Sequence, residues 1–535
     1  MPSTYGGRSM HLTPSSTVRA PRGMVCSVDH LASAAGVDVL RDGGSGADAA
    51  IATSAVLAVT TQHMCGMGGD LFALVHEGAG PPLALNASGR AGSGADAGRL
   101  RDEGHSNMPF RDDVRSAPVP GCIDGWAELH ARCGRLPLGR VLRAATDYAE
   151  HGFPATPLLV GAHERVAGLP GAGDYDDVAP LRPGTIVRRP GAARTLRALA
   201  EGGRAAVFGG DYGDDLLEVG AGEYDRADLD RSQAEWVEPI SAEAFGHTVW
   251  TIPPNSQGYL AAAGAAVASR LDLPDDPDDE RWAHLLVEAA KQVGHDRPEQ
   301  LFDGADGAAL LGPDRLDAQA AAVDRDTAST LPLPTAGGGT IYLCTADRDG
   351  QAVSLIQSNA SGWGSHVVLP RTRIFLHNRG IGFSLDAGHP AEYRAGRRPP
   401  HTLAPTIVTR PDGRLRAVVG TMGGDAQPQI VEQLLVRLLR HGQTPGAAVA
   451  SARWMLTAPG ATGFDTWAEP ARLRVAIEGH AAETWDGGLA RRGHPVDRAE
   501  PWSTGFGHAH VITAEDGHLA GASDPRALTG AAIGW

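Results

Sequence analysis

Several segments of the chain carry apolar residues at helical or strand-like spacing. Residues 47–59 are rich in alanine and apolar nearly throughout, which predicts a buried helix. A glycine-rich stretch follows and leads into the apolar run 71–75, which predicts a loop entering a buried strand. Across residues 280–297 apolar positions recur at helical spacing, with Glu288 and Lys291 on other faces. This pattern is typical of an amphipathic helix.

The clearest internal boundary lies between residues 303 and 339. This stretch is rich in Ala, Asp, Gly and Pro, sustains no period, and ends in three consecutive glycines. Two β-prone runs follow, at 340–346 and 351–358, with Arg348-Asp349-Gly350 between them. Two such runs around a short turn sequence predict a β-hairpin.

The register of this hairpin depends on the length of its turn. A two-residue turn made of Asp349 and Gly350 is the simplest interpretation. It places Thr340 opposite Asn359, beside Ser358. A one-residue bulge would instead place Ser358 opposite Thr340. Both registers stay open at this point.

A strand, a glycine turn and a helix are expected farther along the chain. Residues 415–419 look like a strand, 420–424 read Gly-Thr-Met-Gly-Gly, and apolar residues at helical spacing follow from 431 to 438. Such a junction leaves backbone N–H groups pointing outward, where they can bind an anionic group.

Composition narrows the class of protein. The 535 residues exceed one ordinary domain, so we expect several units or one large layered core. A net charge of −16 argues against a nucleic-acid partner. Residues 1–21 carry no apolar run of the length that a secretory signal requires, and no later apolar run approaches the length of a membrane span. The five cysteines form no metal-type cluster, which favours a reducing compartment, and we expect a cytoplasmic protein.

Five sequence blocks, in order along the chain, resemble signatures of the γ-glutamyltransferase family. They are residues 43–50, 66–70, 253–258, 340–358 and 422–425, and matches extend from about residue 22 to 511. The resemblance implies an α+β fold, the four-layer αββα sandwich of N-terminal-nucleophile hydrolases. It also implies self-cleavage into a large subunit, 1–339, and a small subunit, 340–535, that share one core.

The resemblance also assigns a reaction centre. Thr340 would become the new N-terminus, its Oγ attacking the amide carbonyl while its own α-amino group acts as general base. Ser358 matches the residue whose hydroxyl supports the nucleophile, although it could be an ordinary strand serine. Gly423 and Gly424 match the oxyanion-hole pair, where a side chain would block the approach of the carbonyl. A simple turn is the alternative.

Several positions bear on the substrate. Arg90 matches the arginine that clamps the substrate carboxylate in the family, a task suited to a guanidinium. Gly382 stands where γ-glutamyl enzymes carry an acidic residue for the substrate amino group. His401 and Thr402 replace the family's serine pair, and Arg379 replaces a neutral amide. These departures disfavour an ammonium group and favour a carboxylate or an oxalyl group. Each of them also has a purely structural alternative, since a glycine can simply shape a loop.

We therefore expect an amide hydrolase or acyltransferase for a small carboxylate-bearing substrate, similar to the oxamate amidohydrolase branch of the family. The alternatives are γ-glutamyl transfer from glutathione-like donors, and carbon–carbon bond hydrolysis in antibiotic biosynthesis. A merely binding homologue is disfavoured because Thr340, Gly423 and Gly424 are all present. No cofactor or metal is expected, because His508 and His510 lack a third ligand at diagnostic spacing.

Overall fold

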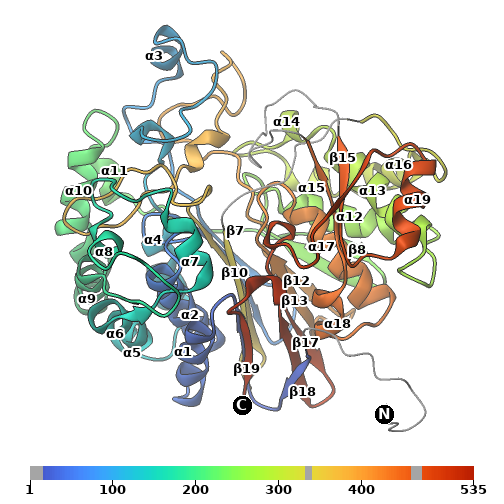
Figure 1. Ribbon diagram of the computed structural model, residues 1–535, viewed down its shortest axis with the longest axis horizontal. Helices are drawn as coiled ribbons and strands as arrows, with labels where there is room; N and C mark the ends of the chain where they lie inside the picture. Colours follow the sequence, from blue (N-terminus) through green and yellow to red (C-terminus); the bar gives the residue numbers. More distant parts are fainter. Residues whose placement is uncertain (1–15, 332–339, 459–472) are drawn as a thin grey trace.

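Two seven-stranded antiparallel sheets lie face to face at the centre of the protein (Figure 1). The structure is a computed structural model and describes residues 16–331, 340–458 and 473–535. The first sheet has, in spatial order, the strands Ala531–Gly534 (β19), Met24–Ser27 (β2), Ile341–Ala346 (β10), Gln351–Ser358 (β11), Asp70–Glu77 (β3), Leu83–Ala87 (β4) and Glu235–Val237 (β7). The second has Val18–Ala20 (β1), His518–Ser523 (β18), Ala509–Glu515 (β17), Leu415–Thr421 (β13), Thr406–Thr409 (β12), His247–Thr251 (β9) and Ile240–Ala244 (β8).

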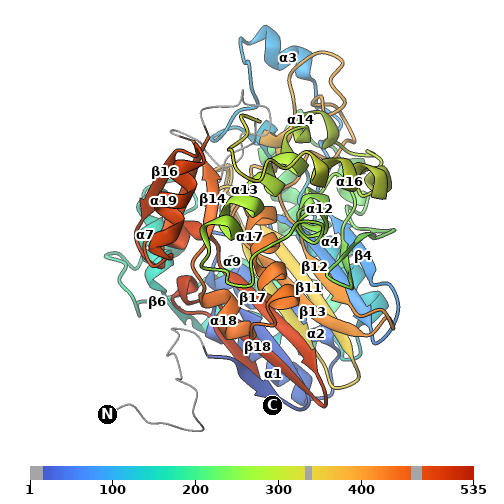
Figure 2. The ribbon, with the colours of Figure 1, turned by 90° about the vertical axis from the view of Figure 1, so that its right-hand side faces the viewer.

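Helices cover the outer face of each sheet and complete four layers (Figures 1 and 2). On the first sheet lie His30–Arg41 (α1), Gly46–Thr60 (α2) and Cys122–Cys133 (α4), and Arg143–His151 (α6), Pro190–Phe208 (α9) and Asp211–Val219 (α10) pack around these helices. On the second sheet lie Gly258–Ala268 (α12), Gln427–Leu435 (α17) and Pro445–Ala450 (α18), and Glu280–Gly294 (α13), Pro313–Ala321 (α16) and Glu483–Arg491 (α19) form a further helical layer packed on them. The expected αββα sandwich is confirmed.

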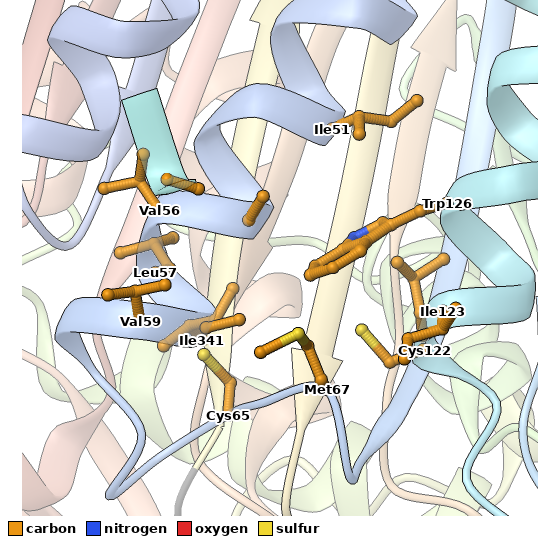
Figure 3. Packing of buried hydrophobic residues seen from close by; sticks show 14 of the residues in the cluster. Ile51, Val56, Leu57, Val59, Cys65, Met67, Cys122, Ile123, Trp126 and Ile341 are labelled. Carbon is orange, nitrogen blue, oxygen red and sulfur yellow. The ribbon is translucent and has the colours of Figure 1, made fainter. Parts of the chain in front are cut away.

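Helix α2 shows why this arrangement forms. All of its residues are buried, as its alanine-rich sequence predicts, and Ser45 caps its start in a reciprocal pair with Asp48. Its small side chains let it lie close to the first sheet. Figure 3 shows the packing of this layer, in which Trp126 of α4 and Ile341 of β10 belong to the same apolar cluster. The predicted helix at 280–297 is also present, although it ends at Gly294.

Successive side chains along a strand point alternately toward the covering helices and toward the facing sheet. In β10, Ile341 and Leu343 pack toward the helices, whereas Tyr342 and Cys344 belong to the core between the two sheets. Thr340, which directly precedes this strand, falls on the side of Tyr342. The space between the sheets is therefore where its side chain belongs.

The hairpin adopts the second of the two registers that the sequence allows. Ile341 pairs with Gln357, and Asp347 donates its N–H to the carbonyl of Gln351. The two-residue turn was therefore wrong: three residues form it, and Gly350 takes a positive φ of 92°. The cause is the side chain of Asp347, which accepts the N–H groups of Asp349 and Gln351, each at 2.9 Å.

Residues on both sides of the expected boundary build the same sheet. Strand β10 pairs with β2, and β11 pairs with β3. The segment before the boundary is more regular than expected, because it contains Gly307–Leu310 (α15) and α16. Residues 332–339, including Gly339 of the expected cleavage site, lie outside the described residues.

Candidate active site

The ends of neighbouring strands bring three polar side chains together. Thr340 stands before β10, Ser358 ends β11, and the register of β11 with β3 places Asp70 opposite Ser358. The Oγ1 of Thr340 lies 2.9 Å from the Oγ of Ser358, and both residues are buried. Ser358 Oγ also accepts the N–H of Ala360 at 2.8 Å. The hydroxyl of Thr340 is thus held in one place by a partner that is itself fixed.

The glycine turn expected after residue 420 ends a strand of the second sheet that packs on β10. Strand β13 packs closely on β10, since a Cβ at Gly420 would lie 2.3 Å from the Tyr342 ring. At its end Gly423 and Gly424 have φ values of 144° and 56°, which L side chains rarely adopt. The conformation itself therefore requires glycine at both positions.

Gln257 ties the glycine turn to the segment that carries Thr402. Its Nε2 donates to the carbonyl of Gly424 at 3.0 Å and to that of Thr402 at 2.8 Å. Asn255, two residues earlier, donates to the carbonyl of Pro399 at 2.7 Å. The block 253–258 therefore positions two parts of the site relative to each other.

Asp70 is the buried anion at the centre of the site. Its Oδ2 lies 2.9 Å from Nε2 of His401 and 3.3 Å from Nδ1 of His377, and its Oδ1 accepts the N–H of Gly89. Burial by itself would raise the pKa of this carboxyl, but the two histidines stabilise its charge more strongly and the pKa lies far below its usual range. Asp70 is therefore ionised.

His401 is held by protein groups on both sides of its ring. Burial and the charge of Arg379 lower the pKa of His401 to about 3, so the ring is neutral. Its Nδ1 accepts the N–H of Leu403 at 3.3 Å, which leaves Nε2 to donate to Asp70. Thr402, the next residue, is buried, and no hydrogen bond joins its Oγ1 to another described residue.

Arg90 lies in an arginine–glutamate–arginine array. One of its guanidinium nitrogens binds Glu235 at 2.9 Å, and Arg398 binds the same carboxylate oxygen at 2.8 Å. The Nη1 atom of Arg90 is buried and forms no hydrogen bond with a described residue. Burial, followed by repulsion from Arg398, lowers the pKa of Arg90 to about 10, so the group remains charged.

Arg379 and Gly382 begin and end a short 3₁₀ turn, Arg379–Gly382. Arg379 is fully buried, and burial lowers its pKa to about 10 despite the opposing charges of Asp70 and Asp425. Asp425, next to the glycine turn, is bound by Arg297 at 2.6 Å. A Cβ at Gly382 would lie 2.5 Å from the carbonyl oxygen of Pro400, so the turn fits only glycine.

The comparisons with known proteins agree with this geometry. A model of the gamma-glutamyltranspeptidase family matches residues 32–534. The chain belongs to this family. The oxamate amidohydrolase proenzyme of Klebsiella pneumoniae is 34% identical over 532 residues, covering 96% of this chain and 98% of that protein. The glutathione hydrolase-like YwrD proenzyme of Bacillus subtilis is 34% identical over 530 residues, with the same coverage.

A solved structure extends the likeness to three dimensions. The crystal structure of a cephalosporin acylase from Bacillus halodurans superposes with a TM-score of 0.88 and 32% identity, over 100% of this chain and 99% of that one. As a member of the gamma-glutamyltranspeptidase family, the chain is a self-processing N-terminal-nucleophile amide hydrolase or acyltransferase. Relatives that are proenzymes imply that one precursor is cleaved into two subunits.

Potential metal ligands lie elsewhere than at His508 and His510. Within residues 16–331, 340–458 and 473–535, three ligand atoms come within reach of one another at His284, Glu288 and His494. The ammonium of Lys291 binds Glu288 at 2.7 Å there, and the two histidines hydrogen bond to each other at 2.9 Å. A lysine already supplies the positive charge that a metal would bring. No helix in the described part of the chain could cross a membrane.

Sequence reasoning missed Asp70, His377 and Gln257 as residues of this site. Asp70 and Gln257 stand in two of the blocks that resemble the family, yet no role was assigned to them. The signal for His377 was weaker, because it depends on a loop that meets Asp70 across some 300 residues of sequence. The predicted residues Thr340, Ser358, Arg379, His401 and Thr402 all lie around this centre.

Proposed function

We propose that the chain cuts itself between Gly339 and Thr340, and that the released Thr340 hydrolyses the amide of a small acid with a carboxylate near the reacting carbonyl. The observation that carries the proposal is the 2.9 Å contact between the hydroxyls of Thr340 and Ser358. This contact lies at the buried ends of β10 and β11. The cations Arg90 and Arg379 belong to the same candidate site.

The reaction follows from the groups at this place. The Oγ of Thr340 attacks the amide carbonyl carbon while the α-amino group of Thr340 takes the hydroxyl proton. Gly423 and Gly424 offer backbone N–H groups to the oxygen that becomes negative. The C–N bond then breaks, the leaving amine takes the proton from the α-ammonium, and an ester remains on Thr340. Water attacks this ester by the same route and releases the acid.

An α-amine suits the task of a base. Its ordinary pKa of about 7.7–8.0 leaves a useful fraction neutral near pH 7.5. Ser358 supports the nucleophile by a hydrogen bond, so its hydroxyl is expected to stabilise the alkoxide that develops as Oγ loses its proton.

The substrate class is inferred from charge and space. Arg90 keeps a buried nitrogen without a hydrogen-bond partner in the described part of the chain, which suits a carboxylate oxygen. The Thr402 hydroxyl can add a hydrogen bond. His401 has protein partners on both ring nitrogens, so we assign it the positioning of Asp70 and of the Thr402 segment. The 34% sequence identity with an oxamate amidohydrolase proenzyme supports an oxalyl-type acid as the substrate.

Neither alternative is favoured. A γ-glutamyl donor carries an α-ammonium group, and this site offers no carboxylate at Gly382 and a buried cation at Arg379. Carbon–carbon hydrolysis would need the same nucleophile, yet no feature of the site distinguishes it from amide hydrolysis. The assignment of amide hydrolysis therefore rests on the similarity to the oxamate amidohydrolase proenzyme.

Two measurements on purified protein test the proposal. N-terminal sequencing of the smaller chain should read Thr-Ile-Tyr-Leu, and Thr340→Ala should remain a single chain of 535 residues. The cleaved enzyme should release ammonia from oxamate with a higher kcat/KM than it releases p-nitroaniline from γ-glutamyl-p-nitroanilide. A different N-terminus would refute the nucleophile, and the reverse substrate preference would refute the substrate class.

A further inference from the structure

A buried ion pair lies directly beside the glycine turn. Asp425 follows Gly424, and its Oδ1 accepts a hydrogen bond of 2.6 Å from Nη2 of Arg297, the first residue of helix Arg297–Gln300 (α14) (Figure 1). The side chains of Arg297 and Asp425 are 2% and 0% exposed. In the described part of the chain, Nε and Nη1 of Arg297 have no hydrogen-bond partner, so Asp425 alone binds this guanidinium. A buried charge satisfied this sparsely is costly, which indicates a role beyond stability.

The turn beside this pair needs anchors because it is built from glycine. Gly423 and Gly424 have φ values of 144° and 56°, and no Cβ restrains the rotation of either residue. The carbonyl of Gly423 accepts the N–H of Ala426 at 3.0 Å, and that of Gly424 accepts Nε2 of Gln257. Asp425 is the next residue, so a rotation at Gly424 would displace its carboxylate from Arg297. The ion pair thus fixes the chain immediately after the two glycines.

Packing alone does not fix this part of the chain. A cavity of about 20 Å³ borders the ion pair and is also lined by Leu260, Val293 and Glu432. Burial raises the pKa of Glu432, which favours its uncharged form and leaves Asp425 as the anion beside Arg297. Because side chains do not fill this space, the position of Asp425 depends on its bond to Arg297.

Asp425 also balances charge near the nucleophile. The negative charges of Asp70 and Asp425 stabilise the Arg379 guanidinium, whereas Arg297 repels it. These four groups, two cations and two anions, sum to zero. On the other side of Arg297, Asp296 is paired with Arg315 at 2.8 Å. Since Asp70 lies opposite Ser358, losing one charge of the four would alter the electrostatic potential at Thr340.

We propose that Arg297 and Asp425 are positioning residues of the reaction. Their ion pair keeps the N–H groups of Gly423 and Gly424 directed at the oxygen that becomes negative, and it keeps the charge around Thr340 balanced. The proposal deepens the proposed function and rests on it. Arg297 precedes the expected cleavage site and Asp425 follows it, so the pair would also join the two subunits after self-cleavage.

Acylation of the cleaved enzyme by p-nitrophenyl acetate tests this step in isolation. The Oγ of Thr340 attacks the ester carbonyl, its α-amino group takes the hydroxyl proton, p-nitrophenolate leaves, and an acetyl group remains on Thr340. The burst of p-nitrophenolate gives the rate, and uncleaved Thr340→Ala supplies the background. This ester needs no pocket for an oxalyl group. Absence of oxamate hydrolysis would therefore refute the proposed substrate class and leave the burst measurement readable.

The rate of the burst measures how well the turn is positioned. Arg297→Gln should slow acylation about tenfold, because the donors to the developing oxyanion are no longer held in place. Arg297→Lys keeps the charge and should slow it only about threefold. Arg270→Gln is the matched control: it breaks a 2.6 Å ion pair with Asp317, in the helical layers over the second sheet, and should acylate at the wild-type rate. Equal rates for Arg297→Gln and the wild type would overturn the proposal.

The pH profile of the burst separates positioning from a general loss of structure. Arg297→Gln leaves Asp425 unbalanced, which favours the ammonium form of Thr340 and should move the acid limb about half a pH unit upward. Asp425→Asn leaves Arg297 and Arg379 without their shared anion and should move the limb about as far downward. The double variant should return it to the wild-type position. A slower burst with an unmoved limb in both single variants would indicate a merely structural contact and overturn the proposal.

Two variants keep the test decisive if a single neutral substitution prevents folding. Arg297→Lys and the double variant leave no lone buried charge, so they avoid the main cause of misfolding. Both should keep the wild-type acid limb, and both should acylate about threefold more slowly because lysine or a pair of amides holds the turn less firmly. Wild-type burst rates in both variants would overturn the proposal.

Discussion

Among the described residues, five buried histidines have a pKa of about 3 or 4, which makes mild acid a specific perturbation of this fold. Burial is the main cause in each case and lowers the pKa of His508 to about 4 and of the others to about 3. The five residues are His63, His401, His494, His508 and His510. In the unfolded chain each would titrate near its ordinary value of about 6.5.

The sign and size of the effect follow from proton linkage. Since the folded pKa is below the unfolded one, only the unfolded chain gains protons as the pH falls through 6.5. Stability is therefore complete above pH 6.5 and is lost progressively until the folded pKa is reached. Each histidine costs about 0.8 kcal/mol between pH 7.5 and 6.0, and the five together cost about 4 kcal/mol. Asp70 and Asp524, whose pKa values are lowered, act only at more acid pH. Burial raises the pKa of Glu432 well above its usual range, so proton uptake by this carboxyl in the folded state offsets part of the histidine effect.

Urea unfolding of the single-chain Thr340→Ala variant, followed by tryptophan fluorescence at pH 7.5 and 6.0, measures this difference. His510→Phe keeps a ring against Tyr342, whose centroid lies 6.2 Å away, and should reduce the difference by about 0.8 kcal/mol. His151→Gln, at a largely exposed site, should leave it unchanged. A difference below about 1 kcal/mol in the parent would mean that these rings are not held neutral in the folded state.

Three further outcomes are expected. Gly382→Asp should lower the yield of folded protein and confer no γ-glutamyl hydrolysis, because a Cβ at this position would clash with the backbone of Pro400. Gly139→Ala is the control: a Cβ there would make only ordinary van der Waals contact, so this variant should behave as wild type in the same assays. Asp70→Asn should slow oxamate hydrolysis roughly tenfold or more, through the loss of a charged hydrogen-bond acceptor, whereas the exposed Asp314→Asn should not; equal rates would refute the role of Asp70. Dialysis against a chelator should leave the rate of oxamate hydrolysis unchanged, and a loss restored by zinc would contradict a metal-free mechanism.

Much of the fold could be predicted because its signals are local. The alanine-rich sequence of α2 and the apolar strand β3 are recognisable by composition alone, and both are present with nearly the expected bounds. The hairpin was predictable as an element, but its register was not. The register depends on whether the Asp347 side chain accepts hydrogen bonds from two backbone N–H groups. Residue propensities for strands and turns do not describe such a contact.

The layer order and the site depend on contacts between distant segments. Strand periodicity shows which residues face inward, but it does not show which sheet faces which. Thr340, Ser358 and Asp70 lie side by side because β10 begins, β11 ends and β3 begins at the same end of the sheet. This arrangement follows only from the pairing of the three strands. His401 reaches Asp70 from 331 positions away, so no spacing rule could connect them.

The same geometry explains why a divergent substrate pocket could arise while the reaction centre stayed fixed. The nucleophile and its partner are set by the ends of paired strands, and the glycine turn by the end of β13 on the facing sheet. Arg379, Gly382 and Thr402 instead lie outside the paired strands, in segments that are hydrogen bonded to this frame by backbone groups and by side chains such as Gln257 and His401. Substitutions in those segments can change the charge presented to the substrate without moving Thr340. A change at Gly382 is the exception, because the turn there is packed against the Pro400 carbonyl, so a γ-glutamyl site could be regained only by moving the backbone as well.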